Sequence, residues 1–242
     1  MPLAKQKLRG WVLWPKIIAG LASAPALTIT TDMTNPGETS ADLLMQESGM
    51  RKVPTDRLEL FYCENFLPDA LCERLIQLIE KDRRPSTIAD PNGDDYFRTS
   101  ETCDLNANEP AVRDLEERLF ALNRITPAHG EPVQGQRYDV GQEFKPHTDF
   151  FEPDGPDFQK FCSIAGNRTW TFMIYLNRVE AGGSTRFKVI KKSFQPRTGM
   201  LVCWNNKRLD GRQNPNSLHH GMKVRKGEKY VITKWYREKL WG

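Results

Sequence analysis

Hydrophobic residues recur at helical spacing in two segments of the chain. The first segment runs from Pro68 to Arg84 and carries apolar side chains at Leu71, Leu75, Leu78 and Ile79. The second runs from Pro110 to Arg124 and carries them at Val112, Leu115, Leu119 and Leu122. Apolar residues three and four positions apart line one side of an α-helix. The pattern therefore predicts amphipathic helices over about 68–84 and 110–124.

Short β-type runs dominate the rest of the chain. One precedes the helices, at 58–62, and the others follow them, at 134–140, 169–176, 200–204 and 229–237. Glycine-containing turn sequences such as Gly182-Gly183 and Lys226-Gly227 separate the later runs. Helices followed by many strands are typical of an α+β protein. We therefore expect the C-terminal half to form a barrel or a sandwich.

The first fifty residues differ from the rest of the chain. They are polar from Thr28 to Ser48, so we expect 1–50 to be a poorly ordered extension and 57–240 to be one domain. A basic start followed by an apolar stretch and Ala22-Ser-Ala24 is also compatible with a targeting segment. The uncharged stretch 17–31 is shorter than the roughly 18 residues that span a bilayer. No membrane span is therefore expected.

Composition narrows the class of protein. Hydrophobic residues make up 38% of the 242 residues, which argues against both an integral membrane protein and a wholly disordered chain. The net charge of +4 is too small to require a nucleic-acid partner. The five cysteines are odd in number and form no CxxC motif, so a disulfide framework is not expected. This cysteine usage favours a reducing compartment and predicts a cytoplasmic location.

Histidine is scarce, but the positions of some histidines suggest a metal site. His147 and Asp149 form an HxD pair whose side chains would share one face of a strand. Such a pair arises easily by chance, so a third ligand is needed, and His219 or His220 offers it. Two imidazoles and one carboxylate are the ligands of non-haem Fe(II) oxygenases, which leave adjacent metal positions open.

A lysine follows at the start of the last alternating strand. Lys229, Val231, Thr233 and Trp235 share one face of this strand, and Tyr230, Ile232, Lys234 and Tyr236 share the other. A lysine on the face toward the barrel interior needs an anion to offset its burial. A dicarboxylic cosubstrate that chelates the metal at one end would supply that anion at its other end.

Several blocks of sequence identify a family resemblance. They are residues 137–151 (RYDVGQEFKPHTDFF), Met173–Asn177 followed by Gly182-Gly183, Ser217–Gly221, Gly227–Tyr230 and Thr233–Trp235, with a weaker match around Arg98-Thr-Ser100. In these blocks the chain resembles the Fe(II)/2-oxoglutarate dioxygenases of the prolyl 4-hydroxylase catalytic-subunit type. The resemblance covers about 57–240. It implies a double-stranded β-helix, or jelly-roll, barrel core with supporting N-terminal helices.

The same resemblance implies roles for individual residues. His147, Asp149 and His219 match the iron ligands, and Lys229 matches the partner of the distal 2-oxoglutarate carboxylate. His219 is chosen over His220 because it has the family spacing to the glycines, the valine and the lysine that follow. Tyr138 matches a tyrosine that hydrogen-bonds the cosubstrate, and Thr233, on the Lys229 face, is placed at the same site.

The family implies hydroxylation of a peptidyl proline at C4. Fe(II), 2-oxoglutarate and O₂ would be required, succinate and CO₂ would be released, and ascorbate would serve as reductant. The partner would be a proline-containing peptide or protein, contacted by the aperiodic segments 86–106 or 152–168; nothing in the pattern indicates an oligomeric state. Two alternatives stay open. One is the same chemistry on a small metabolite, a lysyl side chain or an alkylated base, and the other is a non-catalytic metal-binding barrel.

Overall fold

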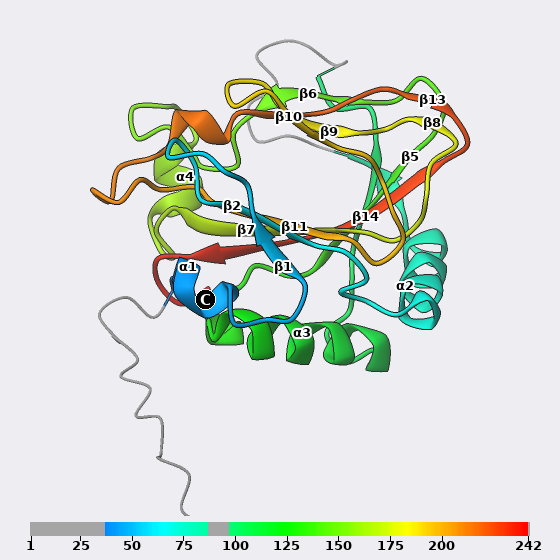
Figure 1. Cartoon of the computed structure of the whole chain (residues 1–242), viewed down its shortest axis with the longest axis horizontal. Helices are drawn as coiled ribbons and strands as arrows, with labels where there is room; N and C mark the ends of the chain where they lie inside the picture. Colours follow the sequence, from blue (N-terminus) through cyan, green and yellow to red (C-terminus); the bar gives the residue numbers. More distant parts are fainter. Residues whose placement is uncertain (1–36, 87–96, 242) are drawn as a thin grey trace, which may run out of the picture. The chain divides into compact units, whose positions relative to one another are not determined.

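The computed structural model describes residues 37–86 and 97–241 (Figure 1). The proposed targeting segment lies outside the described residues. Residues 37–50 form part of the packed structure, although the sequence analysis assigned them to the extension. Within them the short helix α1 (Ala41–Leu44) is capped by the Ser40 hydroxyl and buries Leu44 completely in the core. The packed structure therefore begins well before residue 57.

Most strands belong to one large antiparallel sheet. Its order is β1-β2-β11-β7-β14-β5-β4-β3, with β1 Met50–Lys52, β2 Leu60–Cys63, β11 Leu201–Asn205, β7 Arg168–Tyr175, β14 Lys229–Arg237, β5 Gln134–Tyr138, β4 Glu101–Asp104 and β3 Arg84–Pro85. The longest strands, β7 and β14, pair at its centre. The runs predicted at 58–62, 134–140, 169–176, 200–204 and 229–237 all correspond to strands of this sheet.

A smaller sheet carries much of the candidate site. Its order is β10-β9-β12-β6, with β10 Lys192–Phe194, β9 Thr185–Phe187, β12 His219–Gly221 and β6 Phe144–His147. A separate pair joins β8 (Ala181–Gly182) to β13 (Val224–Lys226). These strands have only two to four residues, and alternation over so short a distance is too weak a signal to predict them.

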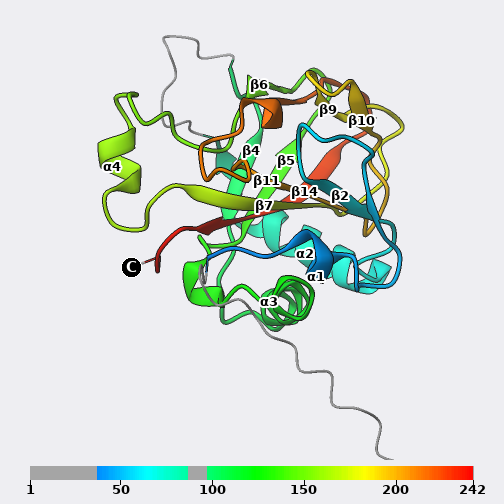
Figure 2. The same ribbon diagram turned by 60° about the vertical axis from the view of Figure 1, so that its left-hand side comes forward.

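Two helices cover the outer face of the large sheet. Figures 1 and 2 show α2 (Asp69–Lys81) and α3 (Pro110–Asn123) on one side of this sheet and the small sheet on the other. Both helices lie within the predicted ranges. The remaining helical elements are η1 (Pro127–His129), α4 (Phe158–Cys162) and η2 (Pro215–Ser217). No helix in the described ranges is long and apolar enough to cross a membrane.

The core has two layers, and strand β14 contributes to both. Tyr230, Ile232 and Tyr236 pack in the cluster between the large sheet and the helices, whereas Val231 packs in the cluster between the two sheets. This is the alternation predicted from the sequence. Because residues on one strand face alternate, the same register directs Lys229 into the space between the sheets.

Candidate metal and cosubstrate site

Three side chains converge at one edge of the small sheet. His147 ends β6 and His219 begins β12, and the two residues are direct antiparallel partners. Asp149 lies just beyond β6, and its Oδ1 atom is 3.8 Å from His147 Nε2 and 4.0 Å from His219 Nε2. One ligand atom from each residue falls within 4.8 Å of the others. The expectation that Asp149 lies on the same strand as His147 was wrong, because the chain bends after β6, yet the two side chains still converge.

Backbone carbonyls orient the two imidazoles. His147 Nδ1 lies 2.7 Å from the carbonyl oxygen of Lys145, and His219 Nδ1 lies 3.0 Å from that of Ser217. A carbonyl only accepts, so each Nδ1 carries the proton and donates it. The Nε2 lone pairs are therefore left facing Asp149. Burial lowers the pKa of both histidines, which favours the neutral imidazole that binds metals.

Aromatic packing restricts the same two rings. Phe144 stacks on His147 with centroids 3.4 Å apart and an interplanar angle of 15°. The His219 ring contacts Phe187 and Trp204, whose ring centroids lie 5.5 and 4.8 Å from its own. The imidazoles are thus fixed by packing as well as by hydrogen bonds, which is the support that a preorganised metal site requires.

A buried hydrogen-bond chain holds the carboxylate of Asp149. The Thr171 hydroxyl donates to Asp149 Oδ2 at 2.7 Å, and Asn206 Nδ2 donates to the Thr171 hydroxyl at 2.9 Å. Burial alone would raise the pKa of Asp149, but His219, His147, Arg168 and the Thr171 hydrogen bond together hold it below its ordinary value. The carboxylate is ionised, with Oδ2 occupied and Oδ1 facing the imidazoles.

The second histidine of the pair points elsewhere. His220 Nε2 lies 3.0 Å from Glu143 Oε2, away from the His147–Asp149 pair. Adjacent residues of a strand face opposite sides, so only one of the two histidines can reach the site. The structure places His219 there, in agreement with the choice made from the sequence.

Lys229 lies in a cavity that these residues also line. The residue is only 2% exposed, and no carboxylate of the described residues forms an ion pair with its ammonium group. Its closest neighbours with π-systems are Tyr138 and Tyr175, whose ring centroids lie 4.8 and 5.5 Å from Nζ. Burial lowers the pKa of Lys229 to about 7. A buried ammonium without a counter-ion is costly, and this arrangement suits an anionic ligand.

Two further predicted residues share this cavity. The Tyr138 hydroxyl donates to Gln136 Oε1 at 2.7 Å, and Gln136 Nε2 donates to the Thr233 hydroxyl at 3.2 Å. Burial raises the pKa of Tyr138, so its hydroxyl stays protonated. The structure therefore brings all six residues predicted from the sequence to one cavity between the sheets (His147, Asp149, His219, Lys229, Tyr138 and Thr233).

Comparison with known proteins places this geometry in a family. The family model described as the 2OG-Fe(II) oxygenase superfamily matches residues 133–237. Probable prolyl 4-hydroxylase 6 of Arabidopsis thaliana is 30% identical over 206 residues, which cover 75% of this chain and 70% of the relative. The chain belongs to the prolyl 4-hydroxylase family of 2OG-Fe(II) oxygenases. The prediction of a 2-oxoglutarate-dependent dioxygenase is thereby confirmed at the level of the family.

Other members of the family are longer. Human prolyl 4-hydroxylase subunit alpha-1 is 30% identical over 189 residues, which cover 76% of this chain but only 35% of that subunit. The chain thus spans about a third of the length of this relative.

Solved prolyl hydroxylases share the fold. The viral collagen prolyl hydroxylase of Paramecium bursaria Chlorella virus-1 aligns with a TM-score of 0.57 and 23% identity, over 74% of this chain and 94% of that one. A Trichoplax adhaerens prolyl hydroxylase, solved with a hypoxia-inducible factor peptide fragment, aligns with a TM-score of 0.57 and 17% identity, over 76% and 84%. The predicted α+β jelly-roll fold is confirmed.

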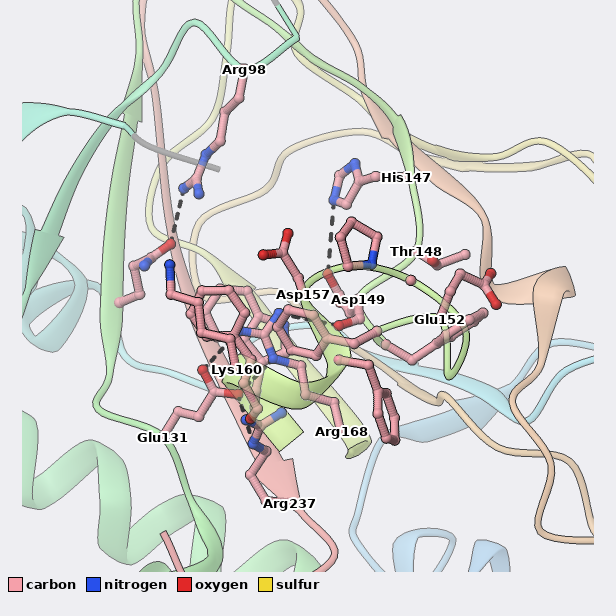
Figure 3. Close-up of a pocket in the computed structure, with 18 of the residues that line it drawn as sticks. Arg98, Glu131, His147, Thr148, Asp149, Glu152, Asp157, Lys160, Arg168 and Arg237 are labelled. Carbon is pink, nitrogen blue, oxygen red and sulfur yellow. Dashed lines mark hydrogen bonds and ion pairs between the residues drawn. The ribbon is translucent and has the colours of Figure 1, made fainter. Parts of the chain in front are cut away.

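In this member of the prolyl 4-hydroxylase family, a larger pocket opens beside the candidate metal site. Figure 3 shows this pocket, which has a volume of about 760 Å³ and reaches His147 and Asp149. The predicted substrate segment 152–168 forms one wall, including the helix α4. Residues 87–96 of the other predicted segment lie outside the described residues. Three aromatic residues, Phe150, Phe151 and Trp235, also line the pocket.

Sequence reasoning missed the polar residues that support the site. Thr171 and Asn206 hold Asp149, and Arg168 Nη1 donates to the Asp149 backbone carbonyl at 3.2 Å. Glu131 and Arg237 join Arg168 at the pocket wall. The available signal was a polar residue inside an otherwise apolar strand, as at Thr171 within 169–176. Such a residue needs a hydrogen-bond partner when buried, but the sequence does not say which.

Proposed function

We propose that this protein is an Fe(II)- and 2-oxoglutarate-dependent dioxygenase that hydroxylates C4 of a proline in a peptide or protein. The buried Lys229, without a carboxylate partner among the described residues and in the same cavity as His147, Asp149 and His219, is the observation that carries the proposal. A structural metal site would explain the three ligands. It gives no reason to bury an ammonium beside them.

The donor set fits a ferrous ion. Two neutral imidazoles and one ionised carboxylate make up the facial arrangement of non-haem iron oxygenases, with positions left for cosubstrate and O₂. His147 and His219 would bind through Nε2, because each Nδ1 is committed to a backbone carbonyl. Asp149 would bind through Oδ1, because Oδ2 accepts from Thr171. Each ligand is therefore proposed to contribute one atom.

The polar groups of the same cavity suit a dicarboxylate. Lys229 would pair with the distal carboxylate of 2-oxoglutarate, and an anion at that position would favour the protonated ammonium. Tyr138 and Thr233 would border the cosubstrate, with Gln136 holding both hydroxyls in place. The ferrous ion with bound 2-oxoglutarate supplies oxidation of an unactivated C–H bond by O₂, with release of succinate and CO₂. The protein holds the reactants in position and excludes water.

The proposed substrate rests on the relatives and on the pocket. The curated relatives carry prolyl 4-hydroxylase in their names, and one solved relative was determined with a peptide fragment. The open pocket of about 760 Å³ beside Asp149 has room for several residues of an extended peptide. Ascorbate is proposed as the reductant that returns oxidised iron to the ferrous state.

Release of succinate tests the chemistry. The full chain with Fe(II) and 2-oxoglutarate is expected to form succinate, and Asp149→Ala is expected to abolish it. Proline-rich peptides are then expected to gain the mass of one oxygen atom. Succinate without a modified peptide would assign the same chemistry to another substrate, such as a small metabolite, a lysyl side chain or an alkylated base. No succinate, despite tight Fe(II) binding, would indicate a non-catalytic metal-binding barrel.

A further inference from the structure

Two arginines share one buried carboxylate at the wall of the large pocket. Arg168 begins β7 and Arg237 ends β14, and the two residues are cross-strand partners. Arg168 donates to both carboxylate oxygens of Glu131, at 2.6 and 2.7 Å. Arg237 Nε lies 3.4 Å from one of the same oxygens. Like charges placed opposite each other on neighbouring strands are destabilising, and one carboxylate offsets only one of them.

Arg237 lacks most of the partners that a buried guanidinium needs. It is 1% exposed, and its Nη2 donates to the backbone carbonyl of Phe161. Its Nε and Nη1 have no hydrogen-bond partner among the described residues. Burial lowers the pKa of Arg237, but an arginine remains charged at neutral pH. The cluster of Arg168, Glu131 and Arg237 therefore carries one uncompensated positive charge.

A third guanidinium, that of Arg98, lines the same pocket. Arg98 hydrogen-bonds only neutral oxygens, those of Ser100, Thr102 and Gln134, and no carboxylate in the described part of the chain pairs with it. In the view of Figure 3, Asp149 lies between Arg98 and Arg168. The charge of Asp149 is committed to the metal site. Three more charged residues line the pocket. Asp157 is half-buried and forms no ion pair with the three arginines among the described residues, and Glu152 and Lys160 are exposed, so that water screens their charges.

We infer that this pocket selects substrates with a carboxylate close to the hydroxylated residue, such as a peptide with Glu or Asp beside the proline. The inference rests on the proposed function and deepens it. Arg168 contacts the Asp149 backbone and its side chain is 16% exposed, so it is the group that meets the carboxylate one or two residues from the reacting carbon. Arg237 shares the Glu131 carboxylate with Arg168, so Glu131 does not neutralise both guanidinium groups at the pocket wall. The excess charge of this cluster attracts an anion and repels a cation.

Matched peptides test the charge preference directly. Proline-rich peptides that differ only in Glu, Gln or Lys on either side of the target proline are incubated with the full chain, Fe(II) and 2-oxoglutarate. Addition of one oxygen atom is followed by mass spectrometry. We expect kcat/KM for the better Glu peptide to exceed that of its Gln counterpart by about tenfold or more, because hydrogen bonds to charged groups are the strong ones. The Lys peptide should be the poorest.

Variants of Arg237 assign the preference to the cluster. Arg237→Gln should reduce the Glu-to-Gln ratio to below about threefold, and Arg237→Lys should retain most of it, because only the first removes the charge. A loss of packing would lower turnover of both peptides alike, so the ratio separates charge from structure. Arg225→Gln, the same substitution at an exposed position of β13, is the control and should leave the ratio unchanged.

Two results would overturn the inference. One is equal kcat/KM for the Glu and Gln peptides with the unmodified protein. The other is a ratio that survives in Arg237→Gln. If neither peptide gains oxygen, the proline assignment fails on its own, and the preference is then measured as binding of the same labelled peptides by fluorescence anisotropy. Equal affinity for the Glu and Gln peptides in this binding measurement would also reject the inferred charge preference.

Discussion

Hydrogen bonds to single atoms decide how the candidate metal ligands are presented. Each imidazole donates a hydrogen bond from Nδ1 to a backbone carbonyl, and Asp149 Oδ2 accepts one from the Thr171 hydroxyl. Because Asn206 donates to the Thr171 hydroxyl, the hydroxyl proton is directed at Asp149 and not elsewhere. The atoms left unpaired are the three that face one another. This preorganisation is the property that single substitutions can test.

Removal of the Thr171 hydroxyl should weaken metal binding. Thr171→Val keeps the shape of the side chain but releases Asp149 Oδ2, and loss of such a supporting hydrogen bond lowers metal affinity by about 10–100-fold. Thr171→Ser should restore most of the affinity. Titration with Co(II) as a spectroscopic substitute for Fe(II) measures the effect without turnover. Thr169→Val is the matched control, since its hydroxyl contacts the Gly37 and Tyr236 carbonyls; similar losses in both variants would exclude a specific role for Thr171.

The two adjacent histidines should respond differently to substitution. His219→Ala removes a proposed ligand and is expected to abolish detectable Co(II) binding and succinate release. His220→Ala removes a contact with Glu143 on the opposite face of the strand and should leave metal affinity within about threefold, because this imidazole faces away from His147 and Asp149. The reverse outcome would show that the wrong imidazole has been assigned.

At the scale of elements, the large sheet acts as a platform between a structural layer and a functional one. The helix α2 buries Leu71, Leu75 and Ile79 against the outer face. Gly135 of β5 makes this packing possible, because a Cβ there would lie 2.3 Å from a side-chain carbon of Ile79. The opposite face of the same strands carries Tyr138, Lys229 and Thr233. Damage to the helix layer should therefore reduce stability before it alters the site.

Truncation of one helix residue tests this division. Leu75 is fully buried, so Leu75→Ala is expected to lower the free energy of unfolding by about 2–5 kcal/mol, from lost burial and a new cavity. Leu209→Ala makes the same change at a residue that is 97% exposed and should alter the free energy of unfolding by less than about 0.5 kcal/mol. Urea unfolding measures both. At a temperature where Leu75→Ala is still folded, its Co(II) affinity should match that of the unmodified protein, and a large loss would argue against separate layers.

At the scale of the whole molecule, the site costs stability. Lys229 is buried with its pKa lowered from 10.5 to about 7, and Arg237 is buried with most of its hydrogen-bonding capacity unused. Both contact aromatic rings, but these contacts do not neutralise the charges. If anions bind at these positions as proposed, the folded protein should gain stability from its ligands.

The buried lysine predicts a pH dependence of stability. Between about pH 7 and 10.5 the unfolded chain binds the Lys229 proton and the folded ligand-free protein does not, so this residue makes the free energy of unfolding rise with pH across that window. Lys229→Met should flatten the rise. Urea unfolding of both proteins at several pH values gives the difference. Parallel curves for the two proteins would show that Lys229 is not buried as a free base.

The ligand should reverse this effect. Bound 2-oxoglutarate pairs with the protonated ammonium, so its stabilisation of the unmodified protein should be larger at pH 7 than at pH 9. In Lys229→Met the stabilisation should be smaller at both pH values. Thermal unfolding with and without 2-oxoglutarate, in the presence of Co(II), measures it. Succinate in place of 2-oxoglutarate serves as a weaker dicarboxylate control.

The sequence predicted the elements whose signal is long and local. The two helices and the strands of the large sheet follow from apolar periodicity over many residues, and the face of β14 that carries Lys229 follows from strict alternation. The strands of the small sheet have three or four residues, and their pairing joins segments far apart in the chain. Their stability comes from tertiary contacts, which no local pattern records.

The sequence by itself thus determined the candidates for the chemistry, because its blocks resemble the family's motifs at His147, Asp149, His219 and Lys229. The tertiary structure decided how they are used. It placed Asp149 in a bend rather than on a strand, committed one atom of each ligand to a hydrogen bond, and brought Glu131, Arg168 and Arg237 to one pocket wall. These outcomes depend on distances between residues remote in sequence, and such distances are fixed only when the two sheets pack.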